Sequence, residues 1–194
     1  MNRCTVFVDT ETTGLRPDYH EIIEIYIIKE DPKGKVIGEW HYKVMPEYLD
    51  RAEPKALEIN GFSIKKWKGA KEFTTIAEEV KDIVQGCIWI GHNPQFDYDF
   101  LQDAFFRAGI PGIRCNLIDT KVLAYEHLPE LGSTSFDNIR RYLGWGTKEA
   151  HTAKCDTIQL RKFYYLCLRM SYFTRLYLRS EEHTSELQSP MYLV

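Results

Sequence analysis

Residues 6–14 read Val-Phe-Val-Asp-Thr-Glu-Thr-Thr-Gly, and this stretch determines the fold that we expect. Three apolar residues, two of them β-branched, predict a buried strand that leads directly into two acids, Asp9 and Glu11. Side chains at positions i and i+2 of a strand share a face, about 7 Å apart along the chain. Two ionised carboxylates in a partly buried site repel each other, and a divalent cation would remove that conflict. The alternative for an isolated Asp-x-Glu is a solvated strand end, so the rest of the chain has to decide.

The composition is that of a single globular domain, with 194 residues and a formal net charge of −3. No apolar run approaches the roughly 18 residues of a membrane-spanning helix, and the N-terminus lacks the layout of a signal peptide. Five cysteines without a metal-type CxxC spacing indicate reduced thiols. We therefore expect a cytoplasmic protein without membrane contact. The net negative charge argues against a protein that coats nucleic acid without sequence preference, since such a protein would be basic. It does not argue against a nuclease, because bound metal ions would offset the charge of an acidic site.

The hydrophobic pattern predicts an α/β fold. Strands are expected at residues 21–28 and 36–44, joined by a turn at 31–35, and with the first strand they form an antiparallel meander. The next stretch, 46–69, reads as irregular, with Pro54 and Gly61 as breakers. Helices and strands then alternate: helix 74–84, strand 87–90, helix 94–108, strand 115–120 leading into a further helix, helix 135–143 and helix 156–178. A mixed sheet, antiparallel meander then parallel strands, flanked by helices, is the predicted architecture of residues 1–178.

The final stretch, residues 179–194, has a different character. It resembles the translation of a common sequencing-adapter oligonucleotide, and we expect it to be a non-native tail. A genuine polar tail is the alternative. Without it the chain carries 24 basic and 25 acidic residues, so the domain is close to neutral.

Two further acids follow predicted strands or open helices. Asp97 lies just after a strand, near the start of a helix, and Asp156 opens the last helix. Both positions belong to the edge of a parallel sheet where functional groups gather. His151 precedes Asp156 by five residues, but His92 precedes Asp97 by the same spacing. Spacing alone therefore does not tell which histidine has a functional role.

Three motifs in this order resemble the DnaQ-like (DEDDh) 3′–5′ exonucleases. Residues 9–14, Asp-Thr-Glu-Thr-Thr-Gly, are similar to the first motif of that family. Residues 92–97, His-Asn-Pro-Gln-Phe-Asp, resemble the second, and residues 151–156, His-Thr-Ala-Lys-Cys-Asp, resemble the third. The resemblance covers roughly residues 4–178. Each motif alone is weak evidence for the family, but the three motifs in this order are strong evidence.

The resemblance implies a ribonuclease-H-like fold and a two-metal site. Two Mg²⁺ or Mn²⁺ ions would be held by four acids, Asp9, Glu11, Asp97 and Asp156. It also implies that His151 is the general base and that His92 is only a neighbour of the site. The residue types agree, since two cations suit four carboxylates and a neutral histidine can accept a proton from water near pH 7.

Further residues are predicted to contact the terminal nucleotide: Thr12, Thr13, Asn60, Phe62, Asn93 and Phe96. A core position is an equally good interpretation of Phe96. We expect Asp137 to cap a helix. The pairs Arg140-Arg141 and Arg161-Lys162 are expected to be exposed to solvent, with phosphate contact as the alternative.

The sequence thus predicts a metal-dependent 3′–5′ exonuclease that removes nucleoside monophosphates from single-stranded DNA 3′ ends. Proofreading or end-trimming is the expected role, as in the epsilon subunit of bacterial DNA polymerase III, with a polymerase subunit as a partner. RNA trimming by the same chemistry is the first alternative. A catalytically silent nucleic-acid- or polymerase-binding module is the second, and the complete set of four acids and His151 argues against it.

Overall fold

The computed structural model describes residues 3–146 and 152–187, with side chains up to residue 171. The strands are β1 (Thr5–Thr12), β2 (Ile22–Glu30), β3 (Val36–Lys43), β4 (Ile88–Gly91) and β5 (Asn116–Asp119). The helices are η1 (Leu49–Arg51), α1 (Pro54–Ile59), α2 (Phe73–Val84), α3 (Pro94–Arg107), α4 (Thr120–His127), α5 (Phe136–Tyr142) and α6 (Ala153–Leu187).

The strands form one five-stranded sheet in the order β3-β2-β1-β4-β5. β1 pairs antiparallel with β2, and β2 pairs antiparallel with β3. β1 pairs parallel with β4, and β4 pairs parallel with β5. The predicted mixed sheet is therefore confirmed, and β1 lies at its centre, between the antiparallel and the parallel half.

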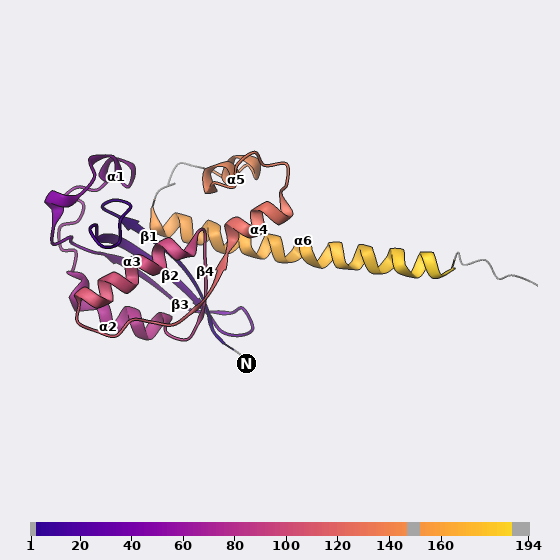
Figure 1. Cartoon of the computed structure of the whole chain (residues 1–194), viewed down its shortest axis with the longest axis horizontal. Coiled ribbons are helices and arrows are strands. Elements are labelled where there is room, and N and C mark those ends of the chain that lie inside the picture. Colours follow the sequence, from indigo (N-terminus) through magenta and orange to yellow (C-terminus); the bar gives the residue numbers. More distant parts are fainter. Residues whose placement is uncertain (1–2, 147–151, 188–194) are drawn as a thin grey trace, which may run out of the picture.

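Helices cover both faces of the sheet (Figure 1). Val6 and Val8 of β1 pack on one face with α2 and α3, and Phe7 packs on the other with α6. Successive residues of a strand point to opposite faces, so a strand covered on both sides has to be apolar throughout. This explains the nearly continuous apolar run of β2, whose residues are buried along almost its full length.

A third core cluster joins the helices of the second half of the chain. It contains Ala124 of α4, Leu128 just after α4, Ile139 of α5, and Phe163 and Cys167 of α6. This cluster holds α5 and α4 against α6, beside the sheet. Helix α6 therefore packs against the sheet through Ala153 and Leu160, and against α4 and α5 further along, through Phe163 and Cys167.

Two parts of the chain differ most from the sequence prediction, while the other predicted elements differ at their ends by one or two residues. The stretch 46–69 contains η1 and α1, and Pro54 begins α1 because proline fits the first turn, where an N–H has no helical partner. Helix α6 begins at Ala153 and continues to Leu187, as the yellow ribbon in Figure 1 shows. Residues 179–187 contain no Gly or Pro, so nothing in them stops a helix. The non-native origin of residues 179–194 stays a prediction.

Within the described part of the chain, no helix combines the length and the apolar character needed to span a bilayer.

Candidate active site

Strand β1 presents two acids on the face that α6 covers. Asp9 and Glu11 alternate with Thr10 and follow Phe7, which packs against α6 on that same face. Asp156 lies in the first turn of α6. Carboxylate oxygens of Asp9, Glu11 and Asp156 all lie within 4.8 Å of one another, and each residue is half-buried. The structure thus brings together three of the four predicted acids; we refer to them as the acid cluster.

The fourth acid, Asp97, lies beside this cluster in the first turn of α3 and is only 5% exposed. Helix α3 follows β4, which runs parallel to β1 with Ile90 opposite Phe7, so α3 starts near the end of β1. Thr10 donates two hydrogen bonds to Asp97 Oδ1, from its backbone N at 2.9 Å and its Oγ1 at 2.6 Å. Asp97 is therefore anchored to the strand residue that separates Asp9 from Glu11.

The pKa values of these acids are raised. Burial, followed by the charges of Asp97 and Asp156, raises the pKa of Asp9 well above its usual range. Burial, together with Asp156 and Glu24, raises the pKa of Glu11 to about 8. Burial also raises the pKa of Asp97 to about 7, against the two hydrogen bonds from Thr10. The four carboxylates therefore do not all ionise near pH 7 without cations, and such oxygen donors suit Mg²⁺ or Mn²⁺.

Arg140 is a member of this site that the sequence prediction missed. The expected solvent exposure is wrong, because Arg140 is 1% exposed and its Nη2 lies 2.5 Å from Oδ1 of Asp156. Its charge lowers the pKa of Asp9 and Glu11, against the larger effect of burial. The residues Phe136, Ile139, Arg140 and Leu143 follow the i, i+3, i+4, i+7 spacing of a buried helix face, which was the available signal.

The neighbouring expectations for α5 and α6 also change. Ser135, not Asp137, caps α5 by accepting a hydrogen bond from Asn138 N. Asp137 instead pairs with Arg140 at 2.7 Å, because a residue one turn earlier reaches its guanidinium. Arg161 is only half-exposed, since its Nε lies 2.5 Å from the buried carboxylate of Glu30. Arg141 and Lys162 are exposed as expected.

Glu24 is a second acid near the cluster that the sequence prediction did not include. It lies opposite Glu11 in the β1–β2 register and is 4% exposed. Nε2 of His41 lies 2.7 Å from its Oε1, so the buried carboxylate has a partner from β3. An acid inside the apolar run of residues 22–28 was the signal for it.

The two histidines of the predicted motifs have different outcomes. His151 lies outside the described residues, so its role as general base stays a prediction. His92 is half-buried, with Nδ1 3.1 Å from Thr120 Oγ1 and its ring 5.0 Å from that of Phe136. Burial lowers the pKa of His92 to about 4, which makes it a weak base near neutral pH.

Several predicted substrate contacts shape the loop at the end of β1. The Thr12 hydroxyl donates to Gly14 O at 2.6 Å, and the Thr13 hydroxyl accepts from Glu21 N at 2.9 Å. Asn60 Nδ2 donates to Thr12 O at 3.0 Å, which attaches the end of α1 to β1. Both hydroxyls are thus engaged within the protein, and direct contact of these residues with a nucleotide stays a prediction.

The remaining candidates surround the same end of the sheet. Phe62 packs against Trp67, with ring centroids 4.9 Å apart. Asn93 is exposed, has a left-handed backbone with φ of 64°, and donates its N–H to Asp119 at 2.9 Å. Phe96 packs against Phe100 at 4.8 Å and against the core, in agreement with the core interpretation. Nucleotide contact by Phe62 and Asn93 stays a prediction.

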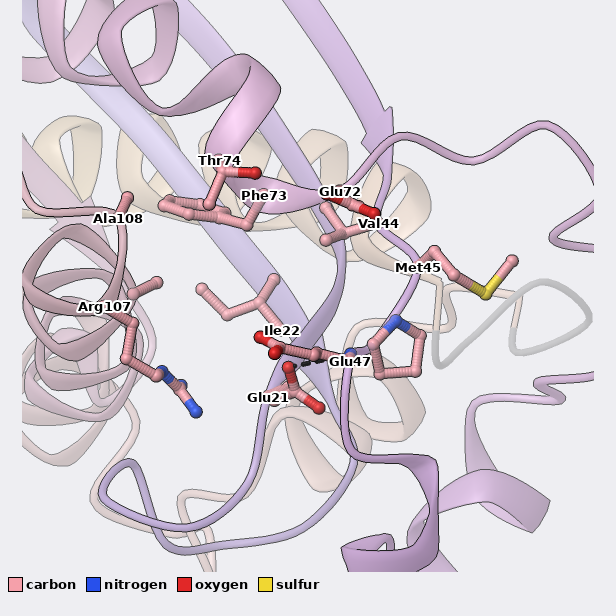
Figure 2. Close-up of a pocket in the computed structure, with 12 residues that line it drawn as sticks. Glu21, Ile22, Val44, Met45, Glu47, Glu72, Phe73, Thr74, Arg107 and Ala108 are labelled. Atoms are coloured by element: carbon pink, nitrogen blue, oxygen red, sulfur yellow. Dashed lines mark hydrogen bonds between the residues drawn. The ribbon is translucent and has the colours of Figure 1, made fainter.

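A pocket of about 370 Å³ lies elsewhere, between the start of β2, residues 44–47, α2 and α3 (Figure 2). Its charged lining residues are Arg107 and three glutamates, Glu21, Glu47 and Glu72. The carboxylate of Glu21 accepts hydrogen bonds from the backbone N–H groups of Glu47 and Tyr48, so it serves to fix this loop. None of the predicted site residues lines this pocket, and its excess of acids does not favour phosphate binding.

Comparison with known proteins connects this geometry to a family. The family model RNase_T, described as "Exonuclease", matches residues 6–164. Curated relatives include the PolC-type DNA polymerase III of Thermotoga maritima, 31% identical over 153 residues, which are 78% of this chain and 11% of the polymerase. The Streptococcus suis PolC-type polymerase is 26% identical over 84% of this chain and 11% of its own length. The chain thus spans about a tenth of the length of these relatives.

Solved structures agree with the fold. E. coli exonuclease I in complex with a dT13 oligonucleotide superimposes with a TM-score of 0.73 at 19% identity, covering 90% of this chain and 42% of the other. A zinc-bound form of the E. coli exonuclease I–ssDNA complex gives a TM-score of 0.73 at 20% identity, covering 93% and 43%. The match of the family model over most of the chain, with the motifs in order on this sheet, shows that the chain belongs to the exonuclease family, among the DnaQ-like 3′–5′ exonucleases.

Proposed function

We propose that this domain hydrolyses the terminal phosphodiester bond at single-stranded DNA 3′ ends and releases nucleoside monophosphates in proofreading or end-trimming. The observation that carries the proposal is the acid cluster, three carboxylates within 4.8 Å at the end of the central strand of an exonuclease-family domain. A silent binding module has no use for a group of half-buried acids, with the buried Asp97 beside them, whose ionisation costs free energy.

The acids are proposed to hold two Mg²⁺ or Mn²⁺ ions. Asp9, Glu11 and Asp156 offer converging oxygens, and Asp97, anchored by Thr10, would complete the set. Bound there, the cations would stabilise the charge on the attacking and leaving oxygens of an in-line displacement. Mg²⁺ and Mn²⁺ both prefer oxygen ligands, so the residues present fit either kind of ion equally.

The proton chemistry is assigned to His151. A water molecule attacks the phosphorus and gives its proton to this side chain, while the bond from phosphorus to the 3′ oxygen of the preceding nucleotide breaks. The terminal nucleotide leaves with the phosphate on its 5′ oxygen. His92 is a poor alternative, since a group with a pKa of about 4 takes up a proton only weakly at pH 7.

We propose DNA and not RNA as the substrate because the similar proteins act on DNA or are bound to it, as their names state. The curated relatives are DNA polymerases, and the exonuclease I structures hold a DNA oligonucleotide. A polymerase is the corresponding partner. Since this chain covers only about a tenth of the polymerases, substrate and partner are both part of the proposal.

The test is digestion of 5′-labelled oligonucleotides of one sequence, as single-stranded DNA, single-stranded RNA and blunt duplex DNA, in Mg²⁺, Mn²⁺ or EDTA. The proposal expects a ladder that shortens from the 3′ end of single-stranded DNA, mononucleotide products, and no cleavage in EDTA. Faster shortening of RNA would favour the RNA-trimming alternative. Binding of DNA without cleavage in either metal would favour the silent module.

A further inference from the structure

Arg140 is a charged side chain in the interior of the protein. It lies on α5, faces α6, and is only 1% exposed. A guanidinium stays charged at any ordinary pH, so its burial is tolerated only when oxygen atoms surround it. Its partners therefore show what it does.

Each partner engages a different nitrogen of the guanidinium. Nε donates to Gln159 Oε1 at 2.6 Å, and Nη1 donates to Asp137 Oδ1 at 2.7 Å. Nη2 lies 2.5 Å from Oδ1 of Asp156. The carbon Cζ lies 4.5 Å from the centre of the Phe136 ring, so an aromatic face covers the planar group as well. The guanidinium is held between two helices, and a lysine at this position, with a single nitrogen, would not make the same three contacts.

Only one of these partners belongs to the acid cluster. Asp137 is on α5 itself, with its side chain 47% exposed, and Gln159 is neutral. Asp156 shares its space with Asp9 and Glu11, whose oxygens lie within 4.8 Å. The pair between Arg140 and Asp156 therefore sets a fixed positive charge against a group of mutually repelling acids.

We infer that Arg140 is the internal counter-ion of the acid cluster and a positioning residue for Asp156. It keeps the carboxylate of Asp156 beside Asp9 and Glu11 before any divalent cation binds, and it fixes the first turn of α6 against α5. The inference rests on the proposed function only in taking these acids as the cation site; the ion pair itself is tested without metal or substrate.

The test is thermal unfolding in EDTA of Arg140→Gln, Asp156→Asn and the double variant. Breaking one side of a buried ion pair is costly, so Arg140→Gln is expected to lower the melting temperature by about 10 °C. Asp156→Asn is expected to lower it as well, by leaving Arg140 without its cluster partner. The double variant should melt no lower than Arg140→Gln, because the second change removes a charge that the first left uncompensated.

Arg141→Gln is the matched control. Arg141 is on the same helix, is exposed, and donates to Asn138 at 2.8 Å, so its loss should change the melting temperature by less than about 2 °C. If Arg140→Gln does not fold, the melting temperatures of Asp156→Asn and Asp9→Asn in EDTA are compared instead. The first should destabilise the metal-free protein. The second should not, since burial and the neighbouring charges of Asp97, Asp156 and Glu11 raise the pKa of Asp9 and outweigh the effect of Arg140.

A second measurement separates a counter-ion from a purely structural contact. Saturating Mn²⁺ should raise the melting temperature of Arg140→Gln more than that of the wild type, because the cation then replaces a missing positive charge. Additive losses in the variant cycle together with equal Mn²⁺ shifts would overturn the inference. If those results came with normal nuclease activity of the wild type, only this inference would fall. Absence of nuclease activity with a non-additive cycle would reject the proposed function instead.

Discussion

Cation binding should release protons from the acid cluster and from Asp97 beside it, and the number of protons released can be measured. The pKa of Glu11 is raised to about 8 and that of Asp97 to about 7, while that of Asp9 is raised well above its usual range. At pH 7 a group with a pKa of 8 is about nine-tenths protonated, and one with a pKa of 7 is about half protonated. Because a carboxylate binds a cation in its ionised form, Mn²⁺ binding at pH 7 should release about one to two protons.

Isothermal titration calorimetry measures this number directly. Mn²⁺ is titrated into the protein at pH 7 in PIPES, HEPES and ACES, and the slope of the binding enthalpy against the enthalpy of buffer protonation gives the protons released. The same experiment at pH 8.5 should give fewer, since Glu11 is by then largely ionised. Glu11→Gln should release about one proton fewer than the wild type at pH 7. A slope of zero at pH 7, with measurable Mn²⁺ binding, would refute the account of the site.

Three further predictions concern the whole domain. In EDTA, thermal stability should fall as pH rises from about 4.5 to about 8, because Glu11 keeps its proton in the folded state after the unfolded chain has lost it. Each unit by which the pKa is raised corresponds to about 1.4 kcal/mol of stability, so a melting temperature that does not change over this pH range would contradict the burial of that carboxylate. His151→Ala should lower the cleavage rate about 10²–10⁴-fold and remove the rise in rate with pH near pH 6–7.5, whereas His92→Ala should keep that rise. The opposite result for the two variants would exchange the roles of the two histidines. Deletion of residues 179–194 should leave the cleavage rate unchanged and the melting temperature within about 5 °C, and a larger drop would show that this stretch packs on the domain.

The parts of the site that the sequence predicted depend on local periodicity and sheet topology. The two-residue period of a strand places Asp9 and Glu11 on one face of β1. The parallel pairing of β1 and β4 brings Asp97 to the same end of the sheet, and the motif order identified Asp156. The positions of Asp9, Glu11 and Asp97 follow from the elements and their order, whereas the grouping of all four acids in one site was implied by the resemblance to the DnaQ-like exonucleases.

The parts that the sequence did not predict depend on packing between distant elements. Arg140 shares the helical spacing of the apolar residues of α5, but a charged residue is buried on such a face only when partners from another helix surround it, and those partners lie on α6. Glu24 faces Glu11 because of the β1–β2 register, which the turn between these strands and the sheet determine. The hydroxyls of Thr12 and Thr13 likewise find their partners in a loop whose path follows from tertiary contacts.

If the acid cluster is the cation site of a 3′–5′ exonuclease, removal of one of its carboxylates should abolish cleavage. The most direct measurement is the rate at which wild type and Asp9→Asn shorten a 5′-labelled single-stranded DNA across a Mg²⁺ titration, with circular dichroism to confirm that the variant is folded. We expect the wild type to remove 3′ nucleotides stepwise with Mg²⁺ and to remove none in EDTA. The cleavage rate of Asp9→Asn should be at least about 100-fold lower at every Mg²⁺ concentration. Folded Asp9→Asn that cleaves within tenfold of the wild-type rate, or wild-type cleavage that continues in EDTA, would contradict this expectation.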